Sequence, residues 1–276
     1  MDAAEELTGA TLTSFRGCYA SASFQIDEAG ELEPPHPVSD NPDPAVPPGC
    51  EALTAESTYC VSMTMEGLAA VGLDSGTVCT SDLAPELQVI DGSSLGWQGD
   101  YLYTCALGVG IARISITDGT VDVAPIACEM VTTYDGGLVA RVGIEEDDAP
   151  FGLLAQFADF DHIAVRKAEH ILALDPYATR IAVEGNQAYF GWHSASTVET
   201  AELADGAPIK SIPLEGFDNW IMGMDVTGHG QLAITSWFDT EALYLFDAET
   251  GAAQGQIPSE LPSRLGGGLK CVSGGR

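Results

Sequence analysis

Short apolar runs separated by polar turns recur along most of the chain. Several are rich in β-branched and aromatic residues, and each follows a turn sequence that contains glycine; examples are 101–105, 137–142, 187–192 and 231–237. Such residues favour strands, and such turns favour the ends of strands. Long stretches with helical periodicity are hard to find, and the best one is the short segment 149–158. The pattern therefore predicts an all-β protein with almost no helix.

The predicted strands belong to a unit that repeats. Each unit consists of an apolar strand, a glycine-containing turn, an aromatic strand, a loop, another apolar strand and a turn with aspartate and glycine. These last turns lie at 74–76, 118–119, 205–206 and 247–251, and a related strand end lies at 172–176. Their mean spacing is about 43 residues, within the ~40–50 residues of a β-propeller blade. We predict one β-propeller domain of four-stranded antiparallel blades over residues 1–276.

Two segments resemble a known group of propellers. Residues 243–251 look like the outer strand and closing turn of quinoprotein-like and YVTN-like β-propellers, and residues 180–190 resemble the inner hairpin of such a blade. The resemblance extends over roughly residues 50 to 260 and implies the propeller fold. That superfamily has many unrelated functions, so the resemblance says little about chemistry.

The two ends of the chain determine the expected blade number. Residues 267–276 look like the first, inner strand of a further blade. An open ring would leave an unpaired edge that invites aggregation, so we expect Thr11–Ile26 to supply the remaining strands of that blade. This closure gives about six blades, with seven as the alternative. The other interpretation is a fragment that has lost its last blade.

Two acidic segments interrupt the repeat. Residues 28–49 contain seven prolines among acidic and polar residues. Because proline lacks a backbone donor, we expect a surface loop there, with a peptide-like docking arm as the alternative. A second acidic insertion is expected near 143–161. Its cluster Glu145, Glu146, Asp147 and Asp148 is the candidate metal site, with Ca²⁺ as the ion because calcium prefers several oxygen ligands; the alternative is a solvated loop.

The charge of the chain excludes some partners. Its 276 residues include 41 acidic and 10 basic residues, a net charge of −31. This balance leaves no basic surface for phosphates, so nucleic acid is excluded as a partner. No apolar stretch approaches the ~20 residues of a membrane helix, and we expect no membrane insertion. An acidic surface poor in lysine is typical of proteins that stay soluble in salt.

The seven cysteines predict disulfides and an oxidising compartment. One pairing rule joins Cys18 with Cys50, Cys60 with Cys79 and Cys105 with Cys128, and leaves Cys271 free. The other rule joins Cys50 with Cys60, Cys79 with Cys105 and Cys271 with Cys18, and leaves Cys128 free. We prefer the first rule because it needs no ring closure; buried reduced thiols are the remaining alternative. We expect a secreted, periplasmic or cell-surface protein whose leader was removed before Met1 was placed as a start codon.

Aromatic residues and histidines supply the functional candidates. Trp97, Trp192, Trp220 and Trp237 recur near turns and strand ends, and are the candidate ligand-binding residues. We predict a non-catalytic extracellular propeller with a protein- or glycan-binding face, and we assign no catalytic residue. The alternative is a metal-dependent propeller hydrolase or lyase. It requires two or more of His162, His170, His193 and His229 to meet at the ring axis.

Overall fold

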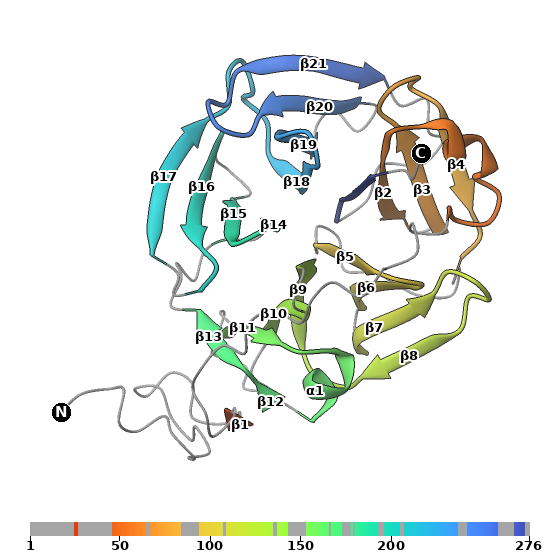
Figure 1. Ribbon diagram of the computed structural model, residues 1–276, viewed down its shortest axis with the longest axis vertical. Helices are drawn as coiled ribbons and strands as arrows, with labels where there is room; N and C mark the ends of the chain where they lie inside the picture. Colours follow the sequence, from red (N-terminus) through yellow and green to blue (C-terminus); the bar gives the residue numbers. More distant parts are fainter. Residues whose placement is uncertain are drawn as a thin grey trace.

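The chain folds into five four-stranded antiparallel sheets, or blades, arranged around one axis (Figure 1). The computed structural model describes residues 25–26, 46–64, 67–83, 94–106, 109–134, 137–142, 153–165, 167–172, 178, 180–192, 196–204, 207–236, 242–258 and 268–273. Within these ranges, no helix has the length and apolar character needed to cross a membrane. The predicted all-β propeller is therefore confirmed, with a different number of blades.

The strands of each blade are given from the innermost to the outermost. The first contains β22 (Lys270–Ser273), β2 (Thr58–Thr64), β3 (Gly67–Gly72) and β4 (Val78–Ser81). The second contains β5 (Leu95–Gln98), β6 (Tyr101–Ala106), β7 (Gly110–Ser115) and β8 (Val121–Ala124). The third contains β9 (Cys128–Tyr134), β10 (Gly137–Val142), β11 (Leu153–Phe157) and β13 (His170–Leu172). The fourth contains β14 (Arg180–Glu184), β15 (Gln187–Gly191), β16 (Thr197–Glu202) and β17 (Pro208–Pro213), and the fifth β18 (Ile221–Thr227), β19 (Gln231–Ser236), β20 (Ala242–Asp247) and β21 (Ala253–Pro258).

Ring closure corrects the expected six or seven blades to five. Residues 270–273 do form the inner strand of a blade, as expected, but β22 pairs with β2, so that the rest of this blade is β2–β4. The described end of the Thr11–Ile26 segment is β1 (Gln25–Ile26), which pairs in parallel with β12 (Lys167–Ala168) near the perimeter of the third blade (Figure 1). Because β22 already covers the inner edge of β2, no additional blade is needed.

The aspartate–glycine turns lie inside blades and not at their ends. They join the third strand to the outermost strand, as at Asp118–Gly119 and Asp247–Gly251; residues 205–206 lie outside the described part. The Asp247 Oδ1 atom accepts hydrogen bonds from the backbone N and the Oγ1 of Thr250, both at 2.8 Å. Gly251 has φ +75°, a conformation that disfavours any other residue. The turn chemistry therefore explains the repeat that the sequence shows.

The third blade departs from the repeat. Residues 153–157, which carry part of the helical periodicity and of the expected acidic insertion, form β11 instead, because a short apolar run fits either a strand or a helix. The additional elements follow β11: the single-turn helix α1 (Phe160–Ala164) and then β12. The only other helical element among the described residues is the 3₁₀ turn η1 (Glu51–Ala55). Of the proline-rich segment, only its end from Val46 onwards is described.

Three disulfides brace the ring. They join Cys105 to Cys128, Cys50 to Cys79 and Cys60 to Cys271. The preferred rule was right for Cys105 and Cys128, which link β6 of the second blade to β9 of the third. It was wrong for Cys50 and Cys60, and Cys271 is bonded and not free, because ring closure sets Cys271 directly opposite Cys60. Cys18 lies outside the described residues.

Candidate functional site

The two faces of the ring carry different connections. Tight turns join the inner strand to the next strand in the second, fourth and fifth blades, as between Glu184 and Gln187, and they lie on one face. The links between successive blades lie on the other face, where each inner strand begins; examples are 125–127 and 214–220. We call this second face the loop face. Residues distant in sequence converge where it meets the ring axis, which makes that point the natural candidate for a binding site.

Buried polar contacts link the inner strands of different blades near the axis at the loop face. The backbone N of Ile181 donates to Ser94 Oγ at 3.1 Å, a contact that joins the fourth blade to the start of the second. The buried Arg180 donates from Nε to the carbonyl oxygen of Met222, and its Nη2 lies 3.9 Å from Met222 Sδ. Burial lowers the pKa of Arg180 to about 10, so this guanidinium remains charged at neutral pH. Ser94, Arg180 and Met222 together form what we call the axial floor.

Two of the candidate tryptophans lie at the loop face beside this floor. Trp220 directly precedes β18 and has 40% of its surface exposed. Trp192 follows β15, is half-buried, and packs against the apolar core between the third and fourth blades. Gly191 lies against Ile221, since a Cβ on Gly191 would lie 3.2 Å from Ile221 Cδ1. Trp192 and Trp220 are therefore the chain neighbours of two residues that meet between the fourth and fifth blades.

The other two tryptophans differ in their placement. Trp97 is a core residue with only 6% of its surface exposed. Its Nε1 donates to the carbonyl oxygen of Gly99 at 2.9 Å, and its ring meets that of Tyr59 edge-on with centroids 6.1 Å apart. These contacts account for Trp97 without a ligand. Trp237 lies outside the described residues.

The described histidines lie in three different segments of the chain. His162 lies on α1 and contacts Asp159 Oδ1 through Nδ1 at 2.7 Å, and His170 belongs to the outermost strand β13. His229 lies in the exposed turn between β18 and β19. His193 and the candidate calcium cluster 145–148 lie outside the described residues. In the part of the chain that the structure describes, no three His, Cys, Asp or Glu side chains gather as metal ligands would.

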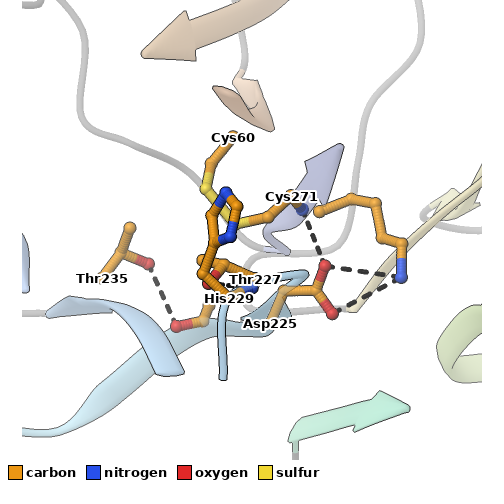
Figure 2. The surroundings of a disulfide bond; sticks show 8 residues. Cys60, Asp225, Thr227, His229, Thr235 and Cys271 are labelled. Carbon is orange, nitrogen blue, oxygen red and sulfur yellow. Dashed lines mark hydrogen bonds and ion pairs between the residues drawn. A yellow bond between two sulfur atoms is a disulfide. The ribbon is translucent and has the colours of Figure 1, made fainter. Parts of the chain in front are cut away.

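A buried carboxylate marks the place where the ring closes, and sequence reasoning missed it. Asp225 on β18 accepts a hydrogen bond from the backbone N of Cys271 at 2.7 Å, and Lys270 Nζ lies 3.4 Å from the same carboxylate. Figure 2 shows this carboxylate next to the Cys60–Cys271 disulfide. Burial raises the pKa of Asp225, although the Lys270 cation opposes the shift. The one available signal was a lone acid inside the apolar run 221–226.

Comparisons with known proteins bear on the fold. The chain matches no known protein family, and no curated protein matches its sequence. One solved structure, a chain of a nidogen/laminin complex, is 12% identical with a TM-score of 0.52, and the match covers 79% of this chain and 100% of that chain. A glutaminyl cyclase from Myxococcus xanthus is 10% identical with a TM-score of 0.48, over 63% of this chain and 73% of that chain. At such low identity the likeness shows a fold alone: this chain is a five-bladed β-propeller.

Proposed function

We propose that this chain is a binding propeller that holds a protein partner at its loop face, with Trp220 as the central anchor. The observation that supports this best is the exposed indole of Trp220, which directly precedes β18 and lies two residues before Met222 of the axial floor. Tryptophan is enriched among the residues that dominate binding energy at protein interfaces. Trp192, which follows β15 at the same face, would then form the edge of the contact, and the buried Arg180 would keep the floor rigid.

The proposal includes an extracellular or periplasmic location and a role without catalysis. Three disulfides favour an oxidising compartment, which supports a secreted, periplasmic or cell-surface protein. Affiliation with the quinoprotein-like or YVTN-like propellers stays a prediction, as does a calcium site at 145–148. The role we assign is binding without turnover.

The test compares Trp220→Ala with Ile209→Ala, which removes an exposed apolar side chain from the outer strand β17. Both variants and the parent protein are immobilised and exposed to the secreted proteins of the source organism. A partner found on the parent is then purified and titrated against all three. Trp220→Ala should weaken binding by about 2 kcal/mol or more, roughly thirtyfold, while Ile209→Ala leaves it nearly unchanged.

Two results would contradict the proposal. One is a partner that binds the parent and Trp220→Ala equally well. The other is a glycan array that shows saccharide binding lost in Trp220→Ala while no protein partner is found, which would assign the indole to sugar stacking. Because Trp220 is exposed, its substitution should leave the melting temperature close to that of the parent.

A further inference from the structure

A second surface with features of an interface lies at the perimeter, where α1 packs against β8 of the second blade. We call it the α1 flank, and its residues are Tyr101, Arg113, Asp122, Phe160, Asp161 and Val165. Arg113 lies at its centre, with Cζ 5.1 Å from the centroid of the Tyr101 ring and 4.6 Å from that of Phe160. Both rings attract the guanidinium through their π faces, which holds Arg113 and α1 in one arrangement.

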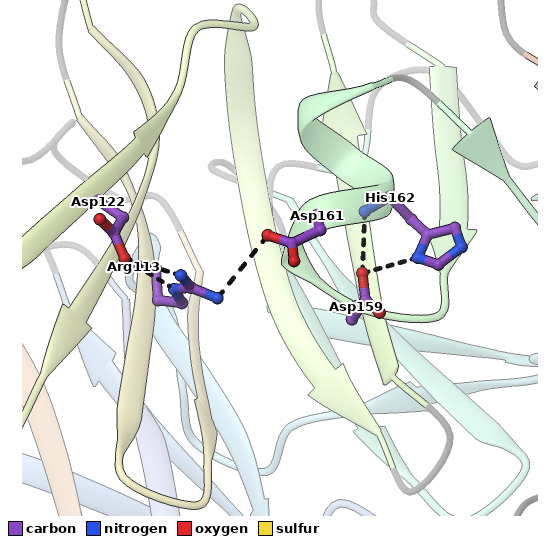
Figure 3. Close-up of polar contacts among 5 residues, drawn as sticks. All are labelled: Arg113, Asp122, Asp159, Asp161 and His162. Carbon is purple, nitrogen blue, oxygen red and sulfur yellow. Dashed lines mark hydrogen bonds and ion pairs between the residues drawn. The ribbon is translucent and has the colours of Figure 1, made fainter.

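The described side chains of the α1 flank carry more negative than positive charge. Arg113 Nη2 donates to Asp122 Oδ2 at 2.7 Å, so Asp122 takes most of the neutralising role (Figure 3). Asp161 lies 4.0 Å from Arg113 Nη1 and its side chain is 86% exposed. The carboxylate of Asp159 accepts from the backbone N of His162 and contacts its ring. Among the described side chains, which exclude those of Arg166 and Lys167, the carboxylates of Asp122 and Asp161 lie within 4.0 Å of the Arg113 guanidinium.

Apolar surface is exposed beside these carboxylates. Tyr101 is 39% exposed although its ring contacts Arg113, and Val165, at the end of α1, is 68% exposed. Tyrosine and arginine held rigidly in place are typical of the residues that contribute most to protein interfaces. The backbone N of Val165 donates to the carbonyl oxygen of Asp161 at 3.2 Å, and Arg113 contacts both Tyr101 and Asp161, so a partner that covers these apolar side chains would bring its own residues within reach of Asp161. A cation on the partner would therefore complement the α1 flank.

We propose that the α1 flank is a second docking surface, for a protein segment that carries an apolar side chain next to a lysine or arginine. The apolar side chain covers Tyr101 and Val165, and the cation pairs with Asp161. The net charge of −31 would speed the approach of such a segment. This surface is separate from the loop face, so the proposal does not depend on the function proposed for Trp220.

In the experiment, a short acetylated peptide of alternating leucine and lysine is titrated into the full chain, and binding is measured by isothermal titration calorimetry. The test variant is Asp161→Asn with Val165→Ser. The matched control is Asp218→Asn with Ile209→Ser, which also removes one exposed carboxylate and one exposed aliphatic side chain. The test variant should bind at least about tenfold more weakly than the parent, and the control within about twofold. Trp220→Ala should bind like the parent.

Several outcomes would overturn this proposal. Equal weakening in the test and control variants would mean that the peptide responds only to overall charge. Absence of binding to the parent would exclude the peptide chemistry, and binding of chitosan oligomers in place of the peptide would assign the surface to a cationic glycan. If the double variant does not fold, as judged by circular dichroism, Asp161→Lys replaces it, since it changes only an exposed carboxylate and should abolish binding.

Discussion

At the scale of single residues, the axis is held together by polar side chains inside apolar strands. The Thr133 Oγ1 atom joins the third blade to the second by donating to the carbonyl oxygen of Trp97 at 2.9 Å. Asp225 likewise joins the fifth blade to β22, through its contacts with Cys271 and Lys270. Burial of such polar groups costs free energy unless they are paired. Each of these contacts therefore favours one particular neighbour for its blade.

Loss of the Asp225 carboxylate should therefore be strongly destabilising. Asp225→Ala leaves Lys270 near the axis without this partner and should lower the free energy of unfolding at neutral pH by about 3–5 kcal/mol. Asp218→Ala, at an exposed position, should change it by less than about 0.5 kcal/mol. Chemical denaturation of both variants and the parent measures the difference, and similar values for the two variants would show that the Asp225 contacts contribute little.

The same pair of proteins gives a pH test with a definite sign. Because burial raises the pKa of Asp225 above its ordinary value of 3.8, the folded state binds this proton more tightly than the unfolded state. Protonation of Asp225 therefore contributes to the free energy of unfolding. This contribution is fully present below about pH 3.8 and is lost as the pH rises through the raised pKa of Asp225. The stability gap between the parent and Asp225→Ala should thus widen on acidification from neutral pH. A narrowing gap would mean that Lys270 outweighs burial.

At the scale of elements, tight turns set the spacing of the strands, and glycine is needed for two separate reasons. Gly185, between β14 and β15, has φ +56° and open space around its Cα, so only its backbone conformation requires glycine. Gly251, between β20 and β21, has φ +75°, and a Cβ there would lie 2.0 Å from the carbonyl oxygen of Pro213. The turn at Gly251 therefore also packs against the link between the fourth and fifth blades.

Two alanine substitutions separate these reasons. Gly185→Ala should cost about 1–2 kcal/mol of unfolding free energy, from backbone strain alone. Gly251→Ala should cost about 1–3 kcal/mol more than that, because the added methyl group displaces the Pro213 backbone. Thermal and urea unfolding of both variants measures this difference. Equal losses would show that the link around Pro213 moves aside freely.

At the scale of the whole molecule, the ring is held by one strand that comes from the far end of the chain. Backbone hydrogen bonds and the Cys60–Cys271 disulfide connect β22 to β2, and these cysteines are 211 residues apart in sequence. A cross-link over such a long loop restricts the unfolded chain more than one over a short loop. The Cys105–Cys128 bond, with a separation of 23, provides the natural comparison.

Removal of the two bonds should therefore have unequal effects. Replacing both Cys60 and Cys271 with serine should lower the free energy of unfolding by about 5 kcal/mol on the loop-entropy estimate, and the same change at Cys105 and Cys128 by about 3 kcal/mol. Double variants avoid a leftover reactive thiol. Denaturant titrations compare them, and a smaller loss for the Cys60–Cys271 pair would show that β22 holds the ring closed without the disulfide.

The all-β class, the four-stranded blades and the presence of disulfides could all be predicted from the amino-acid sequence. These follow from interactions between near neighbours, such as alternating strand residues and the Asp247–Gly251 turn, which a local pattern records. The three-dimensional fold was needed to show that β22 joins β2, that there are five blades, that Cys60 bonds Cys271, and that Trp220 is exposed whereas Trp97 is buried. Each of these depends on which distant segments meet, and a local pattern of apolar and polar residues fits several such pairings equally well.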